Sequence, residues 1–321
     1  MLFLGSLWVY AAEGYTLGHG YRLYDMLTLG AYFSTEYEAT RDEQQFKVED
    51  LAILGYGNLT SSLSYLAELE ATDVYVRNFT EDTERTGTTF HVERAYADYK
   101  FSDAMQVRAG KMITPIGEWN LEPINVLRDT TSNPLYATEM FPRFLSGLSL
   151  YGFVPQADGL QYHLFIQKNR DIDEDYINIR NEHFFGISGS YELDMERSFG
   201  ASVGEFVTEP HEEKFRFIQL NAKYDAYPYK VTAEGMVRHR ENSGGQNAYS
   251  SAAYLQGVYR LETVHSFVAR YEYFDDTLYD DNILIVGYGY RPLYPVSFKA
   301  EYQWHEQSSE DKFLASFSVL F

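Results

Sequence analysis

The chain has no cysteine in its 321 residues. It can therefore form no disulfide, no catalytic thiolate and no cysteine-based metal site, and the absence of thiols is compatible with assembly in the periplasm. Basic residues are also scarce, because 26 Lys and Arg stand against 47 Asp and Glu, for a net charge of −21. Nucleic acids are bound by basic patches, so this balance argues against a nucleic-acid partner.

Long apolar runs are missing too: no stretch reaches the roughly 20 apolar residues that a membrane-spanning helix needs. Residues 1–12 combine a short apolar run with small residues at Ala11 and Ala12, as at the end of a secretory signal peptide, but without its usual positive start. No linker or shift in composition divides the remainder. We expect residues 1–12 to be a signal-peptide remnant and residues 13–321 to form a single domain.

Aromatic residues are abundant, with 29 Tyr and 22 Phe, and yet the mean hydropathy is negative at −0.37. An ordinary soluble core does not account for both values. A membrane β-barrel does, because aromatic girdles cover its outside while its lumen is polar.

The last ten residues, 312–321, alternate strictly. Phe313, Phe317 and Phe321 fall on one face and Lys312 and Ser316 on the other, as in a strand with one apolar side. In a soluble sandwich this strand would leave an exposed apolar edge. In a barrel the last strand pairs with the first and the apolar row faces lipid, so the pattern favours a barrel over a sandwich.

Similar alternation recurs along the chain in segments of about ten residues, the length that a tilted strand needs to cross the hydrocarbon. The segments are 27–36, 46–57, 61–71, 88–101, 105–112, 146–154, 159–168, 183–194, 197–207, 214–226, 229–240, 250–261, 263–274, 282–291, 294–305 and 312–321. Short and long connections alternate between them, as between the periplasmic turns and external loops of outer-membrane barrels. The predicted fold is an all-β, antiparallel transmembrane barrel of about sixteen strands with both termini in the periplasm.

The longest connection, residues 113–145, follows the fifth strand and mixes Trp119 and Phe141 with prolines and charges. A loop of this length is either functional or disordered, and its apolar content argues against disorder. We expect it to fold inward as a constriction loop.

Two stretches carry a family resemblance. Residues 107–120 (VRAGKMITPIGEWN) and 93–101 (ERAYADYKF) resemble the phosphate-selective porin O and P superfamily. The long loop is similar to the constriction loop of sixteen-stranded porins, and the terminal phenylalanine resembles the carboxy-terminal signature of Gram-negative outer-membrane proteins. The resemblance implies an outer-membrane location and a homotrimer. It does not extend to phosphate specificity, because the acidic loops lack the lysine cluster on which anion transport in that family depends.

The cost of placing a charge against lipid, roughly 2 to 4 kcal/mol for Arg or Lys at the midplane, fixes which strand residues face the lumen. The charges of the inner wall either form a network of ion pairs that stiffens the wall, or form a basic strip opposite acidic loop carboxylates whose transverse field orients solutes. At the constriction we expect arginines of the wall to face Glu118, Glu122 or Asp129. The candidate pore-lining residues are Arg94, Asp98, Arg108, Glu118, Glu122, Arg128, Asp129, Arg143, Arg238, Arg270 and Lys299.

These features predict a passive diffusion channel for small hydrophilic solutes or ions, with anions among the candidates and no metal or cofactor. An outer-membrane hydrolase is one alternative, with Ser146, Ser149 and His163 as its nearest nucleophile and base. A structural barrel or a sleeve around a protein partner is another. Acidic loops around Asp171, Asp173 and Asp280 are expected to be solvated, either for solubility or for divalent bridges to lipopolysaccharide. Small residues at Ala31, Ala52 and Ala67 are expected on the lipid face, where a trimer would form.

Overall fold

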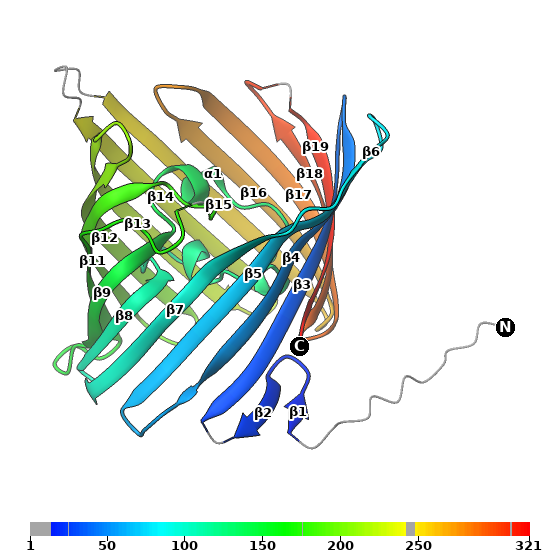
Figure 1. Ribbon diagram of the computed structural model, residues 1–321. Helices are drawn as coiled ribbons and strands as arrows, with labels where there is room; N and C mark the ends of the chain where they lie inside the picture. Colours follow the sequence, from blue (N-terminus) through cyan, green and yellow to red (C-terminus); the bar gives the residue numbers. More distant parts are fainter. Residues whose placement is uncertain (1–13, 25, 175, 242–247, 309) are drawn as a thin grey trace.

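The computed structural model describes residues 14–24, 26–174, 176–241, 248–308 and 310–321, so the predicted signal-peptide remnant lies outside the described residues. Sixteen long antiparallel strands form one closed barrel, because β19 pairs with β3 (Figure 1). The predicted fold is confirmed. The strands are β3 (Leu27–Thr40), β4 (Gln44–Asn58), β5 (Leu63–Asn78), β7 (Thr89–Ser102), β8 (Met105–Ile113), β9 (Phe144–Phe153), β10 (Leu160–Gln167), β11 (Asn181–Glu192), β12 (Arg197–Thr208), β13 (Lys214–Ala226), β14 (Tyr229–Glu241), β15 (Ala248–Leu261), β16 (His265–Asp275), β17 (Asp280–Leu293), β18 (Val296–His305) and β19 (Lys312–Leu320).

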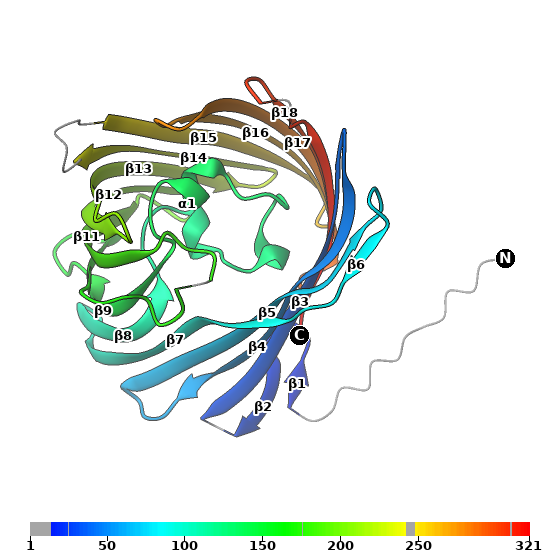
Figure 2. The same ribbon diagram turned by 45° about the horizontal axis from the view of Figure 1, so that its top comes forward.

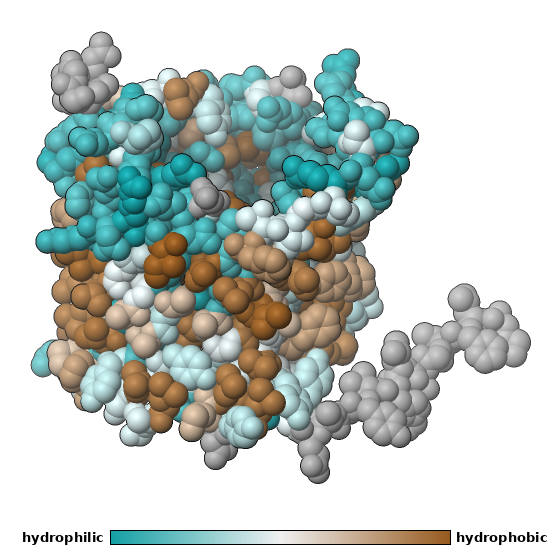
Figure 3. Space-filling view, viewed as in Figure 1, coloured by the Kyte–Doolittle hydropathy of each residue, from teal (hydrophilic) through white to brown (hydrophobic). Residues whose placement is uncertain are grey.

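Alternation of side chains separates the two faces of the wall. In β13, Ile218 and Leu220 are each 62% exposed on the outside, whereas Gln219 between them is fully buried on the inside. On the face seen in Figure 3, a broad apolar band lies below a hydrophilic rim. This distribution is what a lipid-facing barrel requires, since lipid-facing and lumen-facing positions alternate along each strand.

The two ends of the barrel differ. One end, here the turn end, carries compact connections such as residues 103–104 and 227–228, with the carboxyl terminus and the small strands β1 (Tyr15–Thr16) and β2 (Gly20–Tyr24). The other, the loop end, carries the longer connections and β6 (Thr83–Arg85), although residues 41–43 and 276–279 are short there as well. Among the described residues, no helix is long and apolar enough to cross a membrane.

The long connection between β8 and β9 lies inside the barrel (Figure 2). It contains η1 (Trp119–Leu121), η2 (Asn125–Leu127) and α1 (Leu135–Glu139). We call residues 114–143 the constriction loop. Its inward fold confirms the prediction, and it closes part of the lumen.

The constriction loop folds inward because it shares an apolar core with one side of the wall. Ile116, Met140 and Phe141 of the loop are fully buried in a cluster with aromatic side chains of the wall, namely Phe165, Phe184, Phe206, Phe215 and Phe217. Burying a large apolar side chain contributes about 1.5 to 3 kcal/mol. The lumen was expected to be polar, but on this side it contains an apolar cluster.

Two further expectations need correction. Ala52 is fully buried beside Tyr32 and Leu54, so it faces the lumen and not the lipid. Residues 168–180 are not a fully solvated loop either, because Asp171 and Tyr176 are buried against the inner wall. The prediction counted their acidic residues as surface charge and had no means of seeing their partners.

Candidate functional site

Three carboxylates on one side of the wall hold the constriction loop by its backbone. Glu234 of β14 accepts hydrogen bonds from the N–H groups of Glu118 and Trp119, at 2.9 and 2.8 Å. The chain approaches so closely here that a Cβ on Gly117, whose φ is +71°, would lie 2.0 Å from the Glu234 carboxylate. Only glycine adopts this conformation without strain and leaves the space free.

The other two carboxylates act in the same way farther along the loop. Glu301 of β18 accepts from the N–H groups of Thr131 and Ser132 at 2.9 and 3.2 Å, and Glu272 of β16 accepts from Leu135 at 2.8 Å. Hydrogen bonds to a charged acceptor each contribute about 1.5 to 3 kcal/mol. The constriction loop is thus fixed to β14, β16 and β18.

Basic wall residues complete this attachment. Lys299 donates to the backbone carbonyls of Asn125 and Thr130 at 2.8 and 2.9 Å. Arg270 is fully buried and donates to the Thr130 and Ser132 hydroxyls, each at 2.7 Å. Both residues were predicted to line the pore, but their donor groups are occupied by the constriction loop.

On the opposite side of the constriction loop lies a cavity of about 630 Å³ at the loop end, here the loop-end chamber. Arg128 and Arg143 of the constriction loop border it. Carboxylates of the wall border it as well, namely Glu36, Glu38, Glu49, Asp50, Glu70 and Glu93. The predicted polarity is therefore reversed here, since the wall of β3 to β7 is acidic and the loop is basic.

Two β-bulges bring extra carboxylates to this wall. The pairing of β4 with β5 passes from Val48 to Asp50 and omits Glu49, and the pairing of β7 with β5 passes from Val92 to Arg94 and omits Glu93. A bulge places two successive residues opposite one, so regular alternation is interrupted.

Strict alternation along the strands did not predict that Glu49, Asp50 and Glu93 all face the lumen, although the sequence contains an indication of the bulges. Each bulge lies at two adjacent charged residues, Glu49 with Asp50 and Glu93 with Arg94. In a regular strand one residue of each pair would face lipid, at a cost of kilocalories. Adjacent charges within a predicted membrane strand therefore indicate a bulge.

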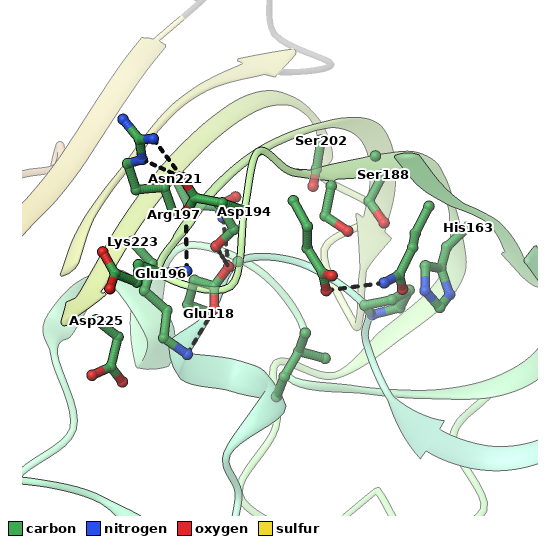
Figure 4. A pocket seen from close by; sticks show the side chains of 18 of the residues that line it. Glu118, His163, Ser188, Asp194, Glu196, Arg197, Ser202, Asn221, Lys223 and Asp225 are labelled. Atoms are coloured by element: carbon green, nitrogen blue, oxygen red, sulfur yellow. Dashed lines mark hydrogen bonds and ion pairs between the residues drawn. The ribbon is translucent and has the colours of Figure 1, made fainter. Parts of the chain in front are cut away.

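A second large cavity, of about 510 Å³, opens at the turn end and is here called the turn-end chamber (Figure 4). Glu118 lies at its centre, where Asn221 donates to its carboxylate at 3.1 Å and the Lys223 ammonium lies 3.7 Å away. The remaining lining mixes hydroxyls, such as those of Ser188 and Ser202, with charged side chains, namely Glu192, Asp194, Glu196, Arg197 and Asp225. This surface can hydrogen-bond water and small polar solutes.

The predicted arginines of the wall do not pair with acids of the constriction loop. Arg94 pairs with Glu68, Arg108 with Asp98 at 2.8 Å, Arg238 with Asp276 at 2.9 Å and Arg270 with Glu272 at 2.8 Å. The predicted pairing with Glu118, Glu122 and Asp129 is wrong. Each of these arginines lies closer to a carboxylate on its own strand, on a neighbouring strand or on the 276–279 connection than to the acids of the constriction loop.

The remaining predicted residues border smaller cavities. Arg128 borders a cavity of about 230 Å³ at the turn end as well as the loop-end chamber, so it lies between the two ends. Asp129 borders the same turn-end cavity and lies 2.9 Å from Lys230. Glu122 and Glu118 border a narrow space beside them. These positions bring the charged residues of the loop together near the middle of the lumen.

Residues 168–174 and 176–180 form a second inward segment, here the inner flap. Lys111 is fully buried, and its ammonium lies 3.1 Å from Asp171. The Val92 N–H donates to Asp173 at 2.9 Å, and His91 lies 3.2 Å from the same carboxylate. Burial raises the pKa of Asp173, but these two partners outweigh it and lower the pKa below its usual value.

The serines and histidine considered for a hydrolase have separate surroundings. Ser146 donates to Asp171, and His163 stacks on Tyr151 with ring centroids 5.2 Å apart. The buried Ser149 hydroxyl has no hydrogen-bond partner among the described residues. A nucleophile needs a base within hydrogen-bond reach, and among the described residues no hydrogen bond joins either serine to His163.

Comparison with known proteins agrees with this geometry. Residues 29–127 match the family model of phosphate-selective porin O and P, which confirms the resemblance seen in the sequence. An uncharacterized protein of Aquifex aeolicus is 26% identical over 170 residues, which make up 51% of this chain and 37% of that protein. The chain thus matches little more than a third of that relative's length.

Solved structures show the same fold. The trimer form of OmpT, an outer membrane protein of Vibrio cholerae, is 11% identical with a TM-score of 0.66, and the match covers 92% of this chain and 99% of OmpT. An anion-selective porin from Comamonas acidovorans is 11% identical with a TM-score of 0.65 and the same coverage. The fold is that of sixteen-stranded outer-membrane porins.

Proposed function

We propose that this protein is a porin of the Gram-negative outer membrane, through which small hydrophilic solutes and ions diffuse passively. The observation that carries the proposal is a closed barrel with an apolar outside and an inward loop that leaves a polar chamber at each end. Ions of either sign are candidate solutes, because both charges line the lumen. Outer-membrane lipid and lipopolysaccharide are the proposed surroundings.

Channel activity is testable with the refolded protein in planar bilayers. We expect stepwise insertions whose conductance rises with salt concentration and varies nearly linearly with voltage, because the charged walls are solvated. Swelling of liposomes in small sugars should show the same permeability for uncharged solutes. Folded, inserted protein that gives no conductance would contradict the proposal and favour the sleeve.

A channel accounts for the structure better than a hydrolase does. Ser146 is hydrogen-bonded to Asp171 and His163 stacks on Tyr151, whereas a channel gives a role to both polar chambers. Hydrolysis of lipid or peptide substrates by the purified protein, lost on changing Ser146 or Ser149, would favour the enzyme instead.

We further propose a homotrimer. Support comes from the described trimer form of the similar Vibrio protein and from the exposed Ala67 and half-buried Ala31 on the outer surface of neighbouring strands. Small residues let two walls approach closely. We expect an unheated sample to migrate on a gel at the mass of a trimer and a boiled sample as a monomer, with Ala67→Trp weakening the trimer. A monomeric mass in mild detergent would exclude it.

A further inference from the structure

The loop-end chamber carries far more negative than positive groups. Among its described lining residues, nine carboxylates face three arginine or lysine side chains. Described residues include no group of three or more His, Cys, Asp or Glu placed to hold a metal ion. The excess therefore acts through its field on passing ions and not by coordinating one of them.

Asp50 and Glu93 are two of the three lumen-facing acids at the bulges, beside Glu49, and they lack a cationic partner within ion-pair distance among the described residues. The Ser34 hydroxyl donates to Asp50 at 2.6 Å and the Tyr32 hydroxyl donates to Glu93 at 2.8 Å. Hydroxyl donors stabilise a carboxylate without neutralising it. The inference rests on these two carboxylates, because each accepts a hydrogen bond from a neutral hydroxyl.

The positive groups that could offset them are partly occupied. Arg128 is buried, with donors directed to the Glu122 carbonyl at 2.6 Å and to Asn133. Arg143 lies over the Phe144 ring at 5.6 Å and borders the same chamber, as does Lys312 of β19, so the constriction loop opposes the acidic wall mainly through Arg143.

Burial makes these charges effective. Exposed loop carboxylates are screened within a Debye length of about 8 Å at physiological salt, while partly buried charges are screened much less. A narrow space with one sign of charge and low-dielectric walls raises the local concentration of counter-ions.

From this arrangement we propose that the pore prefers cationic solutes, and that the preference is set at the bulges by Asp50 and Glu93. The inference rests on the proposed channel function and specifies the charge class of its solutes. Anions still pass, but more slowly than cations of similar size.

The test is the reversal potential in a KCl gradient across a planar bilayer. We expect a K⁺ to Cl⁻ permeability ratio of about threefold or more at 0.1 M salt, declining at 1 M as screening increases. The isosteric double variant Asp50→Asn with Glu93→Gln should lower the ratio at least about twofold, whereas Arg143→Ser should raise it.

A matched control changes the same amount of charge elsewhere. Asp280→Asn with Glu212→Gln removes two exposed acids outside the chamber lining and should leave the ratio unchanged. If the double bulge variant does not fold, Asp50→Asn and Glu93→Gln are measured singly. A wild-type ratio of one or below, or a ratio insensitive to the bulge variants, overturns this inference while leaving the channel intact. Absence of any conductance overturns both.

Discussion

Replacing Glu234 with alanine is expected to detach residues 117–122 of the constriction loop from β14 and to give larger, noisier single-channel currents. The change removes the acceptor for two backbone N–H groups and for the Tyr254 hydroxyl. Losing two charge-assisted hydrogen bonds, each of about 1.5 to 3 kcal/mol, shifts the local opening equilibrium by roughly a hundredfold or more. Currents are measured channel by channel at fixed voltage in 1 M KCl.

Two variants make this result specific to the loop attachment. Glu205→Ala removes a carboxylate of the neighbouring wall that pairs with Lys214 and Arg216 and does not hold the loop, so it should leave the currents unchanged. Gly117→Ala should also widen the pore although residue 234 is left as glutamate. The new Cβ would occupy the space of the Glu234 carboxylate and so displace the loop. Wild-type currents from folded Glu234→Ala protein would show that the remaining contacts hold the loop alone.

Replacing Lys111 with methionine is expected to release the inner flap. Its ammonium lies 3.1 Å from Asp171 and donates to the Asp173 carbonyl at 3.1 Å, with neither side chain of the ion pair appreciably exposed. Removing one partner of a buried ion pair costs about 3 to 5 kcal/mol, because the other charge stays buried without compensation. Limited proteolysis should then cut within residues 168–180, and the temperature at which the folded gel band is lost should fall.

The companion variants separate buried charge from general disruption. Lys111→Met combined with Asp171→Leu removes both charges, so it should recover most of the lost stability, since apolar pairs often replace buried ion pairs at little cost. Lys100→Met breaks an exposed pair with Asp103 and should change stability by at most about 1 kcal/mol. If Lys111→Met is as resistant to protease as the wild type, the ion pair does not hold the flap.

The barrel could be predicted from sequence because lipid acts on every strand in the same way. Ile218 and Leu220 alternate with Gln219, and Phe313 and Phe317 alternate with Ser316. The reason is that a charge or amide placed against hydrocarbon costs more free energy than local contacts contribute. The inward fold of the constriction loop was predictable for a related reason: its apolar residues need burial, and the lumen provides it.

The details of the pore were less predictable, because they depend on which partner lies nearest in space. Arg94 could have met Glu118 or Glu68, and only the pairing of β5 with β7 decides for Glu68. Asp171 looked like a surface charge until Lys111, 60 residues earlier, was placed beside it. Alternation along the strands predicts that Glu234, Glu272 and Glu301 face the lumen, but not that they hold the loop, because a carboxylate that accepts from backbone N–H groups leaves no pattern in the sequence.

The bulges at Glu49 and Glu93 also allow the charge of the lumen to change during evolution. At each bulge the lumen-facing positions change between odd-numbered and even-numbered residues. In β4, Lys47 faces the lumen before the bulge and Ala52 faces it after the bulge. Gain or loss of a single codon at such a point would therefore change the charge of the lumen and leave the lipid-facing residues on both sides in place. We therefore expect that, when sequences of related barrels are aligned, gaps of one residue within these strands coincide with changes in solute preference. Such gaps inside strands are usually taken for alignment errors.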